Sequence, residues 1–330
     1  MSKHSIIPYA FAALLAAITA CNTSGDKEYP PAEIAEVHST LRDFSSSDSI
    51  TRNAIIQAQH IELAAFLKAV GDGEPTVETV GTRAMSPAST VFIPLVDSVF
   101  PDISPLRQTL GDILGRAADI GLSIPKRRYA TVVYGRPQSI LFVDSTMLIA
   151  LNHYLGEEFP GYSHLPAYIR ATKNASMLPA DIAEALVATA YPYNAPAGTS
   201  AIARLIYEGA LAHTKMALTG TAAAPETALG YDISQYQWLE QNETSLWRTL
   251  VEKQLLYDTS EGTTDRLVAP SPATSILGHG TPGRAGRFIG WKIVESYLRR
   301  NPATPADSLL SPAFYTSPSA LRQSGYNPRP

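Results

Sequence analysis

An uncharged run at the N-terminus decides how much of this chain can belong to a folded body. Residues 6–20 (IIPYAFAALLAAITA) carry no charge, follow a short basic start at Lys3 and His4, and end on small residues directly before Cys21. The run is shorter than the roughly 20 apolar residues that a transmembrane helix needs. It is therefore interpreted as the hydrophobic part of a cleaved signal peptide comprising residues 1–20.

The residues around the expected cleavage point indicate a lipid anchor. The sequence Ile18-Thr19-Ala20-Cys21 resembles a bacterial lipobox, in which a branched apolar residue and small residues precede the cysteine that accepts diacylglycerol. Cys21 is the only cysteine of the chain, so it cannot form an internal disulfide. We expect Cys21 to be the lipidated first residue of the mature protein, held in a membrane by its acyl chains, palmitate among them. The alternative is an ordinary signal peptide followed by a chance cysteine.

The segment after Cys21 is typical of a spacer. Residues 22–32 (NTSGDKEYPPA) are polar or small and contain consecutive prolines, so they cannot bury much apolar surface. We expect a flexible tether over residues 21–32 and a folded domain over residues 33–330. Asn22 stands where the simplest inner-membrane retention signal has aspartate, so we expect the protein at the outer membrane, on either its periplasmic or its surface face.

Charge and motifs exclude several function classes. The formal net charge of −4 and the lack of a basic stripe argue against a nucleic-acid partner. No G-x-S-x-G, phosphate-binding loop or G-x-G-x-x-G follows a predicted strand, so nucleophile and nucleotide-binding hypotheses have no support. No internal repeat or long low-complexity linker divides the chain, which predicts a single domain.

Hydrophobic periodicity predicts that most of the chain is helical. The predicted helices span residues 50–70, 89–100, 105–120, 180–191, 199–218, 234–257 and 282–299. The helix over residues 89–100 is the weakest of these predictions, because Pro94 lies inside it and would break or kink it.

One part of the sequence predicts β-structure. Residues 128–134 and 139–143 are rich in β-branched and aromatic residues and are separated by a Gly-Arg-Pro turn, which predicts a β-hairpin. Asp144 or Ser145 is then expected to cap a further helix that continues through Leu155. The predicted fold class is therefore α+β: a helix-dominated single domain with one small antiparallel sheet.

Three of the predicted helices carry charged residues on their apolar faces. Glu208 and Glu243 each align at helical spacing with large apolar neighbours, and Arg287 aligns with the apolar residues of the last predicted helix. Arg284 and Arg287 also occupy the start of that helix, where the helix macrodipole disfavours cations. Because an unpaired buried charge costs several kcal/mol, we expect a buried ion-pair cluster of Glu208, Glu243, Arg284 and Arg287. The alternative is that these charges are solvated at the edges of their helices.

Four stretches of the chain are distinctive. They are DSTMLIALNHYLG (144–156), LIYEGALAH (205–213), QWLEQNETSLWRTLVEKQLLYDT (237–259) and SPATSILGHGTPGRAGRFIGWKIVESYLRR (271–300). Together they resemble the gliding-motility lipoprotein B (GldB-like) family of Bacteroidota, and the last block, PGRxGxxIGWxIVxSY, is the most specific of them. The resemblance covers roughly residue 128 to the C-terminus. It implies an envelope lipoprotein, which in gliding members is associated with surface motility and the protein-secretion machinery. Many members, however, occur in organisms that do not glide.

That family is in turn similar to zinc-peptidase-like (gluzincin-like) proteins, whose central helix bears H-E-x-x-H with a glutamate as general base. The corresponding run here is Tyr207-Glu208-Gly209-Ala210-Leu211, in which the glutamate is kept and both zinc histidines are absent. The resemblance therefore implies a degenerate peptidase scaffold that holds no zinc and no other cofactor. Zinc would need ligands from elsewhere in the chain, such as His213 and Glu243.

Two function classes remain open. The first is a non-catalytic, membrane-anchored envelope lipoprotein that binds a protein partner or acts as a scaffold in gliding motility, protein secretion or envelope biogenesis. The second is a metal-dependent hydrolase or peptidase that uses Glu208 as general base. The missing histidines favour the first class.

Overall fold

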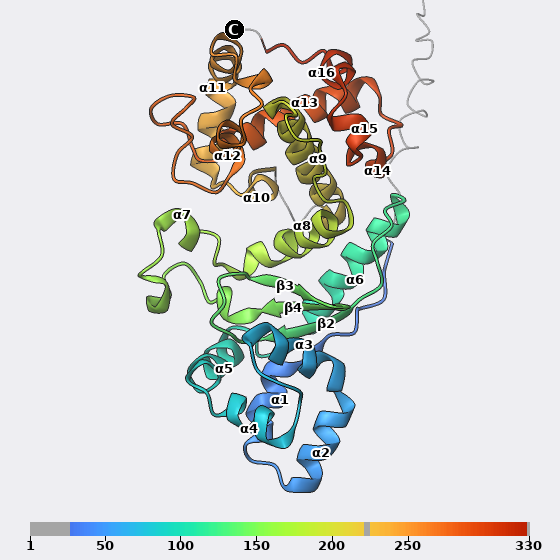
Figure 1. The fold of residues 1–330 in the computed structure, drawn as a ribbon, viewed down its shortest axis with the longest axis vertical. Coiled ribbons are helices and arrows are strands. Elements are labelled where there is room, and N and C mark those ends of the chain that lie inside the picture. Colours follow the sequence, from blue (N-terminus) through green and yellow to red (C-terminus); the bar gives the residue numbers. More distant parts are fainter. Residues whose placement is uncertain (1–26, 221–224, 329–330) are drawn as a thin grey trace, which may run out of the picture.

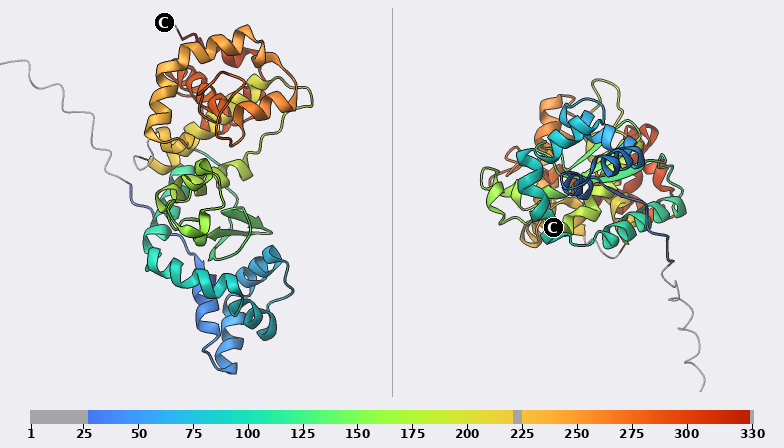
Figure 2. Two further views of the ribbon diagram at one scale, coloured as in Figure 1. Left: turned by 90° about the vertical axis from the view of Figure 1, so that its left-hand side faces the viewer. Right: turned by 90° about the horizontal axis from the view of Figure 1, so that it is seen from below.

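The computed structural model describes residues 27–220 and 225–328, so the expected signal peptide and Cys21 lie outside the described residues. Figure 1 shows an elongated molecule with the N-terminal helices at one end, the sheet in the middle and the C-terminal helices at the other end. The side view in Figure 2 shows the same order. None of the helices in the described ranges has the length and apolar character needed to span a bilayer.

Six helices precede the second strand in the part of the chain that the structure describes. They are α1 (Val37–Phe44), α2 (Ser49–Ala58), α3 (His60–Val70), α4 (Val77–Ala84), α5 (Pro87–Val99) and α6 (Ser104–Asp119). α5 and α6 confirm the helices predicted over residues 89–100 and 105–120, and α5 runs through Pro94. The single helix predicted over residues 50–70 is instead two helices, α2 and α3, which meet at Gln59. The side chain of Gln59 accepts a hydrogen bond from Thr40 of α1 at 3.0 Å, so a tertiary contact interrupts a pattern that is continuous in the sequence.

The central sheet in the described part of the chain has four strands and is mixed. Its strands are β1 (Ala35–Glu36), β2 (Arg128–Val132), β3 (Ile140–Val143) and β4 (Thr146–Ala150), in the order β1-β2-β4-β3. β2 runs parallel to both β1 and β4, whereas β3 is antiparallel to β4. The prediction of an antiparallel hairpin between residues 128–134 and 139–143 is therefore wrong. Both segments contain strands, but β4 lies between them.

β4 occupies the segment for which the sequence predicted a helix through Leu155. All five of its residues are buried, and it leads into a 3-10 turn at Leu151–His153. A strand covered on both faces loses the alternation of polar and apolar residues, so its sequence resembles that of a buried helix. Asp144 and Ser145 cap no helix. They form the two-residue turn between β3 and β4, where Asp144 adopts φ +51°.

In the described part of the chain, the helices that follow β4 are joined by loops, and no further strand occurs. These helices are α7 (Ala167–Arg170), α8 (Leu178–Ala190), α9 (Ala201–Thr219), α10 (Pro225–Leu229), α11 (Ile233–Glu252), α12 (Glu261–Val268), α13 (Ala285–Arg300), α14 (Ala306–Leu309), α15 (Pro312–Tyr315) and α16 (Pro318–Ser324). The four helices predicted in this part of the chain correspond to α8, α9, α11 and α13. The structure is thus α+β and helix-dominated, as predicted.

Two glycines bring α9 and α13 into backbone contact. A Cβ atom at Gly290 of α13 would lie 1.7 Å from the carbonyl oxygen of Leu205 of α9. A Cβ atom at Gly209 would lie 2.2 Å from the carbonyl carbon of Gly290. Only glycine permits this approach, and it places the side chains that flank the contact within reach of one another.

The described part of the expected tether lies against the folded body. Residues 27–32 follow α6, where the Tyr29 ring covers Gly115. The backbone N–H of Ala32 donates to the carbonyl oxygen of Arg107 at 2.9 Å. The glycines of α6 leave room for this segment. The polarity of residues 22–32 gave no indication that its last residues pack against a helix.

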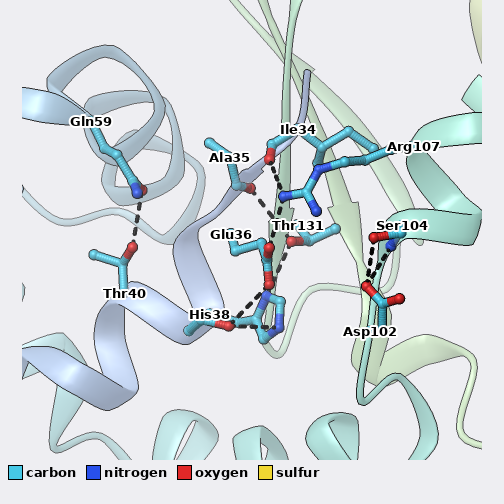
Figure 3. A network of polar contacts seen from close by, with 11 residues as sticks. Ile34, Ala35, Glu36, His38, Thr40, Gln59, Asp102, Ser104, Arg107 and Thr131 are labelled. Carbon is cyan, nitrogen blue, oxygen red and sulfur yellow. Dashed lines mark hydrogen bonds and ion pairs between the residues drawn. The ribbon is translucent and has the colours of Figure 1, made fainter. Parts of the chain in front are cut away.

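A polar network then fixes β1 at the edge of the sheet (Figure 3). Arg107 of α6 donates to the Glu36 carboxylate at 2.7 Å and to the carbonyl oxygen of Ile34 at 3.2 Å. His38, which is buried, places its Nδ1 3.0 Å from the hydroxyl of Thr131 on β2. The N-terminal segment is thereby joined to both the sheet and α6.

Candidate functional site

Charged side chains meet where α9 packs against both α8 and α13. Arg287 of α13 is 1% exposed, and its Nη2 donates to Oε2 of Glu184 on α8 at 2.8 Å. Its Nε lies 3.6 Å from Oε2 of Glu208 on α9, an ion-pair contact that is too long for a hydrogen bond. Lys215 of α9 is also buried and pairs with Glu184. We refer to Glu184, Glu208, Lys215 and Arg287 as the charge cluster.

The structure brings together only part of the set that the sequence singled out. Glu208 and Arg287 face each other, and Arg284 lies beside them without an ion pair among the described residues. Glu243 of α11 does not join them. It accepts a hydrogen bond from the Tyr326 hydroxyl at 2.9 Å and lies 3.5 Å from Lys292. Lys292 follows Arg287 on α13 by more than one helical turn, so Glu243 contacts α13 at a different point along the helix from Glu208.

Sequence reasoning missed two members of the charge cluster. Lys215 lies four residues after Leu211 and three before Leu218, so it shares the apolar stripe of α9 that singled out Glu208. The same spacing rule could have identified it. Glu184 carried a weaker signal, because its side chain is 30% exposed and lies at the border of the apolar face of α8.

Glu208 is engaged on both of its oxygens. Oε1 accepts a hydrogen bond from Nε of Arg204, one helical turn earlier, at 2.9 Å, while Oε2 faces Arg287. Arg204 is itself stacked over the rings of Tyr193 and Tyr207. Two guanidinium groups thus hold the carboxylate in one orientation.

Burial and charge pairing shift the pKa values of the cluster in opposite directions. Burial by itself raises the pKa of Glu184, but Arg287 and Lys215 hold that pKa well below its ordinary value. Burial lowers the pKa of the Lys215 ammonium to about 8 despite the attraction of Glu184. Burial also raises the pKa of the neighbouring Asp181, which accepts a hydrogen bond from the Tyr154 hydroxyl at 2.9 Å. At neutral pH Glu184 is therefore ionised and holds two cations.

A cavity of about 600 Å³ adjoins the charge cluster on its α8 side. Asp181 and Glu184 line it from α8, and Arg284 lines it from the start of α13. Glu157, Tyr168 of α7 and Asp232, which caps α11, add further polar groups to the wall. Segments that are far apart in the sequence therefore place charged and aromatic groups around one cavity that is open to solvent.

The positions that would bear zinc histidines in H-E-x-x-H belong to the core. Tyr207 packs against the rings of Tyr193 and Tyr315, and its hydroxyl donates to the carbonyl oxygen of Tyr191. Leu211 is 3% exposed. Within residues 27–220 and 225–328, no three His, Cys, Asp or Glu side chains are grouped so that they could hold a metal ion.

The other metal-ligand candidates do not converge. His213 lies on α9, and burial lowers the pKa of its imidazole, which does not decide whether it could bind a metal. The proposed second ligand, Glu243, lies on α11, where its carboxylate accepts a hydrogen bond from Tyr326 and pairs with Lys292 of α13. These residues therefore do not fit a zinc ion held beside Glu208.

Comparisons with known proteins gave one family. A family model described as gliding motility protein GldB matches residues 27–328. The searches of curated proteins and of solved structures gave no match. The matched range contains α1 to α16, the charge cluster and the cavity.

Proposed function

We propose a function on the premise that this chain belongs to the GldB family of gliding motility proteins. We propose that the protein is an envelope lipoprotein and that it acts by binding a partner and not by catalysis. Family membership suggests a role in gliding motility and a membrane-anchored place in the cell envelope. The lipobox-like sequence ending at Cys21 supports lipidation at that residue. Asn22 supports the outer membrane as the destination, and the partner would be another envelope protein.

The observation that carries the non-catalytic role is the engagement of Glu208. A general base needs a free oxygen directed at the water or group from which it removes a proton. Both oxygens of Glu208 instead face guanidinium groups, those of Arg204 and Arg287. Glu208 therefore serves to hold α9 against α13.

The test of the non-catalytic role is the metal content of the purified protein. We expect substoichiometric zinc, because the described residues do not group as zinc ligands. A metal-dependent hydrolase would instead contain one zinc ion per chain and would lose hydrolytic activity in the Glu208→Gln variant. That combination of results would overturn the proposal.

The anchor is tested separately by cell fractionation. We expect Cys21→Ala to move the protein from the membrane fraction to the soluble fraction, because no acyl chain can then be attached. Asn22→Gln is the matched control, since it changes the next residue and leaves the lipobox-like sequence intact. If Cys21→Ala protein stays in the membrane fraction and labelled palmitate does not enter the wild type, the lipid anchor is refuted.

A further inference from the structure

We infer that the cavity beside the charge cluster binds a carboxylate group of a small organic molecule, and that Arg284 is the residue that holds it. The inference goes beyond the motility role and does not depend on the lipid anchor. It is carried by an unpaired guanidinium, by the charge balance around it and by the chemistry of the remaining cavity wall.

Arg284 is an arginine without a counter-ion in the part of the chain that the structure describes. It lines the cavity, yet no carboxylate oxygen lies within ion-pair distance of it, and its buried Nε has no hydrogen-bond partner. It also stands at the N-cap of α13 with φ +62°, where an arginine is strained and the helix macrodipole disfavours a cation. A buried donor of this kind costs free energy unless an acceptor reaches it.

The neighbouring carboxylates are already shared between other cations. Glu184 faces both Arg287 and Lys215, and Glu208 faces both Arg204 and Arg287. No acid of the charge cluster is left for Arg284. The guanidinium of Arg284 therefore has no counter-ion of its own on the side of the charge cluster, and an anion that reached it from the cavity would supply one, although the wall as a whole carries more acids than cations.

The rest of the cavity wall favours a carboxylate over phosphate. Glu157 and Asp232 line the cavity together with the two acids of α8, so a doubly charged anion would be repelled. A singly charged carboxylate can form two parallel hydrogen bonds with a guanidinium and meets less repulsion. The acids can then accept hydrogen bonds from donors elsewhere on the same molecule.

The size and the apolar part of the wall fit a ligand of peptide dimensions. The volume of about 600 Å³ lies within the range of about 300–1,000 Å³ found for small-molecule sites. Ala185 and Ala188 of α8 and the Tyr168 ring supply apolar surface beside the polar groups. The free C-terminus of a short peptide combines a carboxylate with such donors and small apolar groups.

Chemical labelling of arginine tests the inference on the mature protein as it is purified from cells, in detergent. Phenylglyoxal is applied, and the labelling rate of each arginine is followed by mass spectrometry of proteolytic peptides. We expect Arg284 to be labelled, and excess acetate to slow that labelling about tenfold. Tri-alanine should protect at lower concentration than acetate, whereas tri-alanine amide, which lacks the carboxylate, should not protect. Arg299 of the same helix is the internal control, because it is 65% exposed and should be labelled equally in every sample.

Each other outcome of this experiment has a defined meaning. If Arg284 is never labelled, the cavity admits no small molecule and the inference fails. If neither acetate nor tri-alanine protects Arg284, or if inorganic phosphate alone protects it, carboxylate binding is refuted. Equal protection by tri-alanine and by its amide would refute it as well. Equilibrium dialysis with radiolabelled tri-alanine should further show binding weakened about tenfold by Arg284→Gln and unchanged by Arg299→Gln.

Discussion

Arg287 is the single residue on which the junction of α8, α9 and α13 depends most. We expect Arg287→Met to lower the free energy of unfolding by about 3–5 kcal/mol, because Glu184 and Glu208 lose the cation that both of them face. Adding Glu208→Gln should restore part of the loss, since a neutral amide needs less compensation. Arg299→Met, at the exposed end of the same helix, should change the value by no more than about 0.5 kcal/mol. Denaturant unfolding measures all three variants, and an Arg287→Met protein with wild-type stability would show that the ion pairs are not structural.

The sequence made Glu208 and Arg287 predictable because both interrupt an apolar stripe at helical spacing. The spacing could not identify their common partner, Glu184, since a residue at the border of an apolar face looks like an ordinary surface acid. It also grouped Glu243 with Arg287, because periodicity gives the face of a helix but not the level at which two helices meet.

At the scale of elements, the crossing of α9 and α13 is set by glycine. We expect Gly290→Ala to lower the free energy of unfolding by about 2–4 kcal/mol, because the new methyl group would overlap the backbone of Leu205 and force the helices apart. The gain in helix propensity, about 1 kcal/mol, does not offset this. Gly262→Ala in α12 is the matched control, since its Cβ would meet nothing closer than 3.7 Å. Thermal unfolding compares the two variants, and equal melting temperatures would contradict the close crossing.

The elements themselves were predictable to different degrees. Long amphipathic helices such as α6, α9 and α13 follow from periodicity, because one face of each meets the core and repeats every turn. β4 did not follow, because both of its faces are buried and no alternation remains. The sheet order could not be predicted either, since β4 lies between two strands that precede it in the chain.

At the scale of the whole molecule, buried histidines make the free energy of unfolding depend on pH. Burial lowers the pKa of His38 and His213, and burial together with Lys173 lowers that of His153 to about 4. Below pH 6.5 the unfolded chain takes up protons that the folded chain does not, so the free energy of unfolding falls as the pH drops from 6.5 to 4. For His153 alone the loss is on the order of 2–3 kcal/mol.

Unfolding measured at a series of pH values tests this. His153→Gln should be less sensitive to acid than the wild type, whereas His164→Gln, at an exposed position, should behave as the wild type does. If His153→Gln shows the same fall in stability between pH 6.5 and 4, the imidazole of His153 is not held neutral by the fold.

The packing of residues 27–32 along α6 shortens the stretch of chain that could separate the folded body from a lipid at Cys21. With Cys21 in the membrane as proposed, six peptide units separate the lipid-bearing residue from Lys27, and a fully extended chain of that length spans about 20 Å. Lys27 is in turn paired with Asp119 at the end of α6. The folded domain would thus stay within a thin layer above the bilayer, with its α6 side facing the lipid. The proposed envelope partner would then need a contact surface within that layer.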